Sequence, residues 1–105
     1  LNWFVDGYDG KALRPACTVA DPVSGRCLDV ATTEPGLLVY PCSAFDGSIT
    51  GKDGKPFERY AALALETQHF PDTPHRPYLP QCLLRPGEKF KSVTEYRFGV
   101  LQDNE

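Results

Sequence analysis

A single carboxylate, Glu66, is the side chain whose position in the sequence best suits acid–base chemistry. It follows an apolar stretch, residues 61–65, that leads into polar residues. With the two-residue period of a β-strand, Ala62, Ala64 and Glu66 point to one side, and the intervening leucines point to the other. A carboxylate beside methyl groups at a strand end would be partly desolvated, which suits it to proton transfer. The alternative is an ordinary surface glutamate at a strand end.

The rest of the chain predicts an all-β protein of short strands and frequent turns, without a substantial helix. Ten prolines and nine glycines accompany frequent Val, Thr, Tyr and Phe, a composition typical of strands joined by turns. Besides the strand that ends at Glu66, we expect strands at residues 2–5, 12–20, 26–33, 37–40 and 90–100. Residues 42–60 are predicted to form a long surface loop, since they are rich in turn residues.

Three local details sharpen this prediction. The Arg14-Pro15 pair interrupts the second strand, so that strand should lie at a sheet edge or contain a bulge there. The Asp21–Gly25 segment predicts a hairpin turn, because proline presets one backbone dihedral and glycine can take a positive one. Trp3, inside an apolar run, is expected to anchor the core.

Length and charge limit the classes of protein that come into question. With 105 residues the chain makes at most one domain, covering 1–105. The net charge of −3 argues against a nucleic-acid partner or a membrane-surface role. No apolar stretch approaches the length of about 18 residues that a membrane-spanning helix needs. The chain begins with Leu1 and contains no methionine, which indicates a fragment of a longer protein or, alternatively, a small β module.

The four cysteines, Cys17, Cys27, Cys42 and Cys82, leave the redox state open. They could form disulfides, whose pairing the sequence does not determine, or remain buried thiols. Cys17 and Cys27 flank the predicted hairpin turn and could therefore lie close together. Secretion would favour disulfides, but the compartment is not determined. No cysteine has metal-ligand spacing to a histidine, so we expect no metal site.

Several motifs resemble the C-terminal part of the aldose 1-epimerase (galactose mutarotase) family. The central one is ALETQHFPD at residues 64–72, followed by LLRPGE at 83–88. Upstream, the DPVSGR turn at 21–26 and TTEPG at 32–36 also match the family pattern. Together these motifs extend the resemblance over nearly the whole chain.

The resemblance implies a fold, an activity and roles for individual residues. The fold would be an antiparallel β-sandwich, the C-terminal fragment of a larger galactose-mutarotase-like supersandwich. Glu66 matches the general base that helps interconvert the α and β anomers of hexoses such as galactose or glucose. Tyr40, whose ring could pack on a pyranose, and Gln68 are the expected substrate contacts, and no cofactor or metal is implied.

The same resemblance shows what this chain lacks. The family's general-acid histidine lies far upstream, and neither His69 nor His75 matches it, although His69 could support Glu66 from nearby. The chain alone should therefore be inactive, with the missing N-terminal part of the domain as its partner. Leu1-Asn2 stand at the positions of the family's Asp-His pair, whose Asp contacts sugar hydroxyls. The family's valine–glutamine–aromatic–tyrosine run reads Leu-Leu-Val-Tyr at 37–40, and Pro41-Cys42-Ser43 stand where the family continues with Thr-Gly-Asn. The alternative function is a non-catalytic carbohydrate-binding or protein-interaction β module.

Overall fold

The computed structural model, which describes residues 1–101, is almost entirely β-structure, as the sequence predicts. Six strands form two antiparallel three-stranded sheets, with strand orders β1-β4-β5 and β2-β3-β6. The strands are β1 (Asn2–Phe4), β2 (Arg14–Ala20), β3 (Arg26–Thr32), β4 (Gly36–Tyr40), β5 (Ala64–Gln68) and β6 (Thr94–Val100). Two short 3-10 turns, η1 (Lys52–Gly54) and η2 (Thr73–His75), are the other regular elements of the described residues. The arrangement matches a fragment of a β-sandwich.

The β2-β3-β6 sheet is built on the predicted hairpin. Gly25 has a φ of 77°, and the Asp21 carboxylate accepts hydrogen bonds from the Val23 amide at 3.1 Å and the Ser24 hydroxyl at 2.7 Å. Both hydrogen bonds lower the pKa of Asp21, and the bond from the Ser24 hydroxyl has the larger effect. The sequence predicted an edge position or a bulge for β2, and both occur: β2 is an edge strand of its sheet, and its pairing register shifts between Pro15 and Cys17. The last strand is shorter than predicted, since it begins at Thr94.

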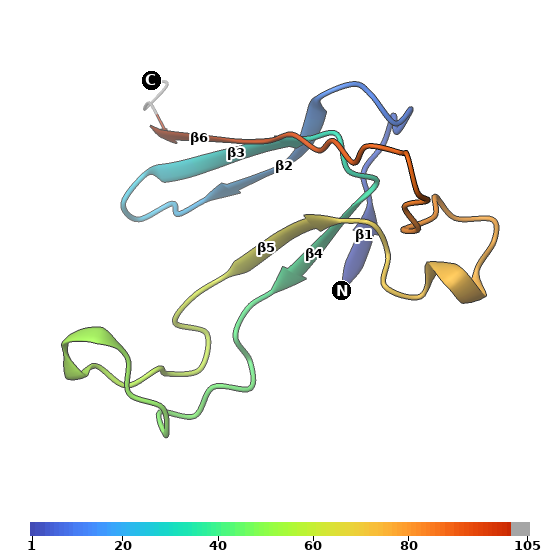
Figure 1. Ribbon diagram of the computed structural model, residues 1–105. Coiled ribbons are helices and arrows are strands. Elements are labelled where there is room, and N and C mark those ends of the chain that lie inside the picture. The colour runs from blue at the N-terminus through green and yellow to red at the C-terminus, as the bar shows by residue number, and fades with distance from the viewer. Residues whose placement is uncertain (102–105) are drawn as a thin grey trace.

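In the β1-β4-β5 sheet, β4 is the central strand. Leu37 on β4 is 1% exposed and Val30 on β3 is 2% exposed, and these two residues mark the core between the sheets. Few polar contacts join the sheets directly: the Thr67 and Thr94 hydroxyls lie 2.7 Å apart, and the Tyr96 hydroxyl donates to the Leu65 carbonyl at 3.2 Å. Figure 1 shows that the two sheets diverge from the end where β3 passes into β4.

Arg14 holds that end together. Its guanidinium donates to the carbonyls of Val5, Asp6, Thr32 and Glu34 at 2.8–2.9 Å and lies 5.4 Å from the centre of the Tyr8 ring. Val5 and Asp6 belong to the segment that follows β1, whereas Thr32 and Glu34 lie where the chain passes from β3 to β4. The Arg14 side chain therefore joins these two connections.

Away from this end, the facing surfaces of the sheets are open. On the face of β6 that is turned toward the other sheet, Tyr96 is 45%, Phe98 79% and Val100 68% exposed. Trp3, predicted to anchor the core, is 53% exposed. That prediction is wrong because β1 is an edge strand and the Trp3 side chain points into the space where the two sheets diverge.

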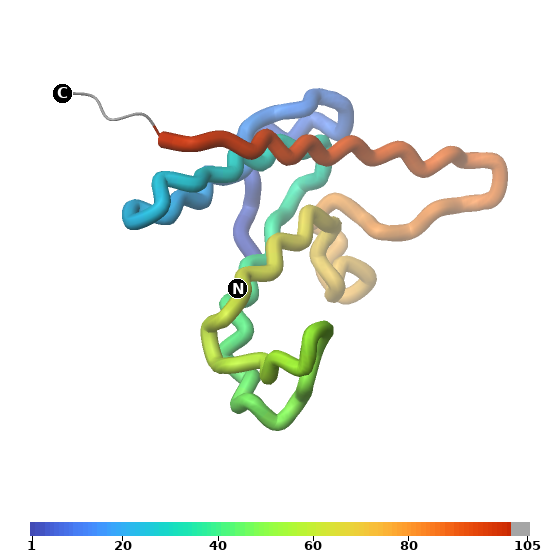
Figure 2. Tube along the Cα trace, turned by 90° about the vertical axis from the view of Figure 1, so that its left-hand side faces the viewer, coloured from blue at the N-terminus to red at the C-terminus, as the bar shows by residue number. Residues whose placement is uncertain are grey.

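Two long connections extend from the sheets (Figure 2). The segment between β4 and β5 contains the predicted surface loop. Contacts within the loop hold it in shape. The rings of Phe45 and Phe57 stack with centroids 5.6 Å apart, and the backbones of Thr50 and Pro56 form an isolated antiparallel β-bridge. The segment between β5 and β6 contains η2 and four prolines at every third position, Pro71, Pro74, Pro77 and Pro80. Within the described residues, no helix has the length and apolar character needed to cross a membrane.

All four cysteines are free thiols. In the hairpin register, Cys17 pairs with Val30 and Cys27 pairs with Ala20. The two cysteines therefore do not pair with each other, and they lie on opposite faces of the sheet. Burial, and secondarily the Asp29 carboxylate, raise the pKa of the Cys17 thiol.

We expect brief alkylation of the native chain to label Cys82 first, because it is the exposed cysteine and thiolate character together with access controls reactivity. Cys42, which is 7% exposed, should react only on unfolding, and Cys17 should react slowly. Peptide mass spectrometry without prior reduction measures the order. Two cysteines that react only after reduction would indicate a disulfide instead.

Candidate functional site

The strand register brings the predicted site residues to one face of the β1-β4-β5 sheet. Glu66 on β5 is paired with Leu38 on β4, which is paired with Asn2 on β1. Residues paired directly across neighbouring strands share a face, as do residues two apart on one strand. Tyr40 and Gln68 therefore lie on the same face as Glu66, and this face is turned away from the second sheet.

Glu66 is exposed on that face. Of the two environments that the sequence left open, partial desolvation is wrong for this chain and the surface glutamate is correct, because β5 is a sheet edge and the small side chain of Ala64 beside Glu66 gives little cover. The predicted alternation itself is correct, since Leu65 lies on the opposite face, toward the other sheet, where its carbonyl accepts from Tyr96. The site is thus an open face with a carboxylate near its edge.

Gln68 is tied to the opposite edge of the same face. Its amide Nε2 donates to the Asn2 Oδ1 at 3.2 Å, so the two side chains meet across the central strand. Gly36 lies between Gln68 and Phe4 in the register. The Asn2–Gln68 pair orients an amide group two residues from the Glu66 carboxylate.

An aromatic pair closes this end of the face. The rings of Phe4 and Phe70 are 4.6 Å apart between centroids, and Phe70 occupies the space above Gly36. A Cβ atom at Gly36 would come within 2.7 Å of the Phe70 ring and 3.1 Å of the Gln68 carbonyl oxygen. Gly36 is therefore required by packing.

We expect Gly36→Ala to displace the Phe70 ring and lower the free energy of unfolding by about 1–3 kcal/mol, the typical cost of overpacking. Gly99→Ala is a matched control in the other sheet, because its Cβ would meet the Cys27 Sγ at an ordinary 3.5 Å. Urea denaturation followed by circular dichroism measures both. Equal midpoints for the two variants would show that Phe70 moves at no cost.

Tyr40 lies at the other end of the face. Its hydroxyl accepts a hydrogen bond from the Ala44 amide at 3.2 Å, and its ring meets Phe45 edge-on at 6.5 Å. The side chain is half-buried. Tyr40 thus takes part in local packing while its side chain stays partly exposed.

A glutamate–histidine pair lies elsewhere and is not anticipated by the sequence. Glu34 is 8% exposed, and its Oε1 lies 3.2 Å from the His69 Nδ1. His69 does not support Glu66, because side chains alternate along a strand and positions 66 and 69 differ in parity. The sequence signal that could have found the pair is the position of Glu34 in the turn between two apolar strands.

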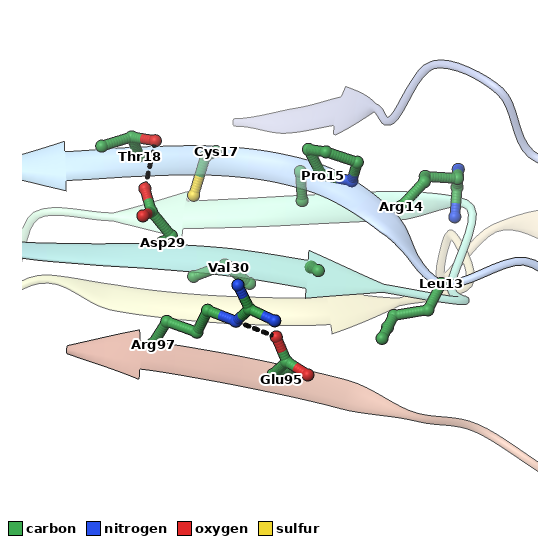
Figure 3. A pocket seen from close by; sticks show the side chains of 11 residues that line it. Leu13, Arg14, Pro15, Cys17, Thr18, Asp29, Val30, Glu95 and Arg97 are labelled. Atoms are coloured by element: carbon green, nitrogen blue, oxygen red, sulfur yellow. Dashed lines mark hydrogen bonds and ion pairs between the residues drawn. The ribbon is translucent and has the colours of Figure 1, made fainter.

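A cavity lies away from the Glu66 face. It has a volume of about 580 Å³ and is lined by Leu13 and by residues of β2, β3 and β6. In Figure 3, the Thr18 hydroxyl donates to Asp29, and Arg97 pairs with Glu95. Because these polar groups already satisfy one another, the cavity presents no acid–base pair. Among residues 1–101, no group of three or more His, Cys, Asp or Glu side chains could hold a metal ion.

The fold and this face define a fragment of an all-β protein that presents a carboxylate, an amide and an aromatic ring on one sheet. The family model for aldose 1-epimerase matches residues 2–97, and the chain belongs to the aldose 1-epimerase family.

Individual relatives agree with this assignment. The chain is 38% identical over 106 aligned residues to galactose mutarotase of Mus musculus, covering 94% of this chain and 31% of the relative. Identity to galactose mutarotase of Homo sapiens is 42%, with the same coverage. Aldose 1-epimerase of Escherichia coli (strain K12) is 42% identical over 104 residues, covering 90% of this chain and 30% of the relative. The chain thus spans less than a third of the length of these relatives.

Proposed function

We propose that this chain contributes the general base, Glu66, to an aldose 1-epimerase that interconverts the α and β anomers of hexoses such as galactose or glucose. The observation that carries the proposal is the register that puts Glu66, Gln68 and Tyr40 on one sheet face. On this face, Glu66 is the proton acceptor, the Gln68 amide is a hydrogen-bonding group for sugar hydroxyls, and the Tyr40 ring is an apolar surface for the pyranose.

The reaction needs two proton transfers. Glu66 removes the proton from the C1 hydroxyl while an acid protonates the ring oxygen, and the C1–O5 bond breaks to give the open-chain aldehyde. Rotation about C1–C2 and reversal of both transfers close the ring as the other anomer. His69 does not supply the acid, since its Nδ1 meets Glu34 on the opposite side of the strand. We infer that the acid comes from outside this chain, and the proposed reaction uses no cofactor.

The open faces of the sheets support a composite domain. Side chains such as Phe98 and Val100 would normally be covered in a folded β-sandwich. In the mouse relative, the part outside the alignment is more than twice as long as the part that aligns with this chain. We infer that residues 1–105 are one part of a larger domain, whose remaining part covers the exposed surface of β6 and adds the acid beside Glu66.

The experiment compares this chain alone with a completed domain, in which residues 2–97 replace the matching segment of Mus musculus galactose mutarotase. Polarimetry of freshly dissolved α-galactose and α-glucose measures mutarotation. We expect no rate enhancement by the chain alone and a substantial enhancement by the completed domain. An inactive completed domain with a native circular dichroism spectrum would overturn the proposal.

The second candidate is a non-catalytic β module that binds carbohydrate or a protein. Exposed apolar side chains on the facing surfaces of both sheets favour it, since such patches mark interaction sites. Sugar binding by the completed domain without mutarotation would favour this candidate.

A further inference from the structure

The residue nearest to Glu66 across the sheet is a leucine. Leu38 pairs directly with Glu66, and side chains paired in this way have Cβ atoms about 5 Å apart. Along its own strand, Glu66 lies between Ala64 and Gln68 on the shared face. Only Gln68 is polar among these three neighbours, and one of its N–H groups is already donated to Asn2 at 3.2 Å.

This arrangement limits how a sugar can lie over Glu66. A pyranose that contacts both Glu66 on the edge strand and the proposed Tyr40 ring on the central strand extends over Leu38, which is half-buried. The substituents within reach of Leu38 are those close to the anomeric carbon, on C2 and on C5. A hydroxyl pressed against leucine loses water without gaining a partner, whereas hydrogen or methyl does not.

We propose that Leu38 is a specificity-determining residue that favours a deoxyaldose as substrate. Near the anomeric centre, such a sugar carries hydrogen in place of the parent sugar's hydroxyl group, or methyl in place of its hydroxymethyl group. The inference rests on the proposed function, because it assumes that the reacting sugar lies over Glu66. It concerns the choice among sugars, and the acid–base step is unchanged.

The test measures kcat/KM of the completed domain for two matched pairs, 2-deoxyglucose against glucose and 6-deoxygalactose against galactose. We expect at least one deoxyaldose to be used about tenfold better than its parent, since apolar surfaces discriminate against an added hydroxyl by at most about a hundredfold. Leu38→Gln supplies a hydrogen-bonding group at the same position and should remove that preference. Leu38→Ile, which stays apolar, should retain it, as should Leu83→Gln in an exposed loop.

Equal deoxy-to-parent ratios in the unaltered domain and in Leu38→Gln would overturn the inference while leaving the proposed function intact. Circular dichroism checks folding, and Leu38→Thr replaces Leu38→Gln if the latter is unfolded. If the completed domain lacks mutarotation, so that the proposed function fails, calorimetric Kd ratios for the same sugar pairs still decide the role of Leu38. A tenfold Kd ratio between parent and deoxy sugar that Leu38→Gln removes supports the role of Leu38, and a Kd ratio that Leu38→Gln leaves unchanged contradicts it.

Discussion

Glu66→Gln lowers kcat for mutarotation by the completed domain by about 10²–10⁴-fold, the usual contribution of one general base. The amide keeps the size and most of the hydrogen-bonding capacity of the carboxylate but does not accept the C1 hydroxyl proton. Because Glu66 is exposed on the sheet face, the substitution leaves no buried group unpaired, and the protein should fold normally. KM should change little, since the lost interaction belongs to the transition state.

Two matched variants separate base catalysis from a general effect of charge. Glu66→Asp retains a carboxylate on a shorter stem, so its kcat should lie between those of the unaltered domain and Glu66→Gln. Glu88→Gln removes an exposed carboxylate from a loop and should leave kcat unchanged. Full activity of Glu66→Gln would assign the base to another residue and remove the basis of the proposed function.

Arg14→Met produces the largest expected loss of stability, about 3 kcal/mol or more. The guanidinium donates to four backbone carbonyls at 2.8–2.9 Å, and a charged donor contributes roughly 1.5–3 kcal/mol per hydrogen bond. The total stays below the sum of four such bonds, because the site is only partly buried and water can replace some of them. Methionine preserves much of the side-chain volume, so the variant tests mainly the lost donors.

Urea denaturation of the variant and the unaltered chain measures this effect. Arg14→Lys should recover only part of the loss, because one ammonium group cannot reach carbonyls on both connections as a planar guanidinium does. Arg26→Met, on an exposed arginine of β3, controls for the loss of charge and should change the free energy of unfolding by less than about 0.5 kcal/mol. Equal losses at positions 14 and 26 would show that Arg14 does not hold the two sheets together.

Much of the candidate site could be predicted because it depends on local pattern and on motifs. The two-residue period placed Glu66 and Leu65 on opposite faces, and the Arg14-Pro15 pair predicted an edge position or a bulge in β2, both of which occur. The family motifs led to Glu66, Gln68 and Tyr40, which the register then brought to one face. Exposure could not be predicted in the same way. Trp3 was expected in the core, and for Glu66 the sequence left partial desolvation and a surface position open, yet both residues are exposed on edge strands.

The sequence by itself determined the all-β class, the hairpin at Gly25, the family and the residues of the candidate site. Each of these follows from neighbouring residues, through side-chain alternation, turn conformation or a contiguous motif. Only the tertiary structure decided that β4 separates Glu66 from Asn2, that His69 pairs with Glu34, and that Arg14 joins the two sheet connections. These contacts unite residues from different parts of the chain. Long-range strand pairing brings them together, whereas a turn can specify pairing only between neighbouring strands, as in the hairpin at Gly25.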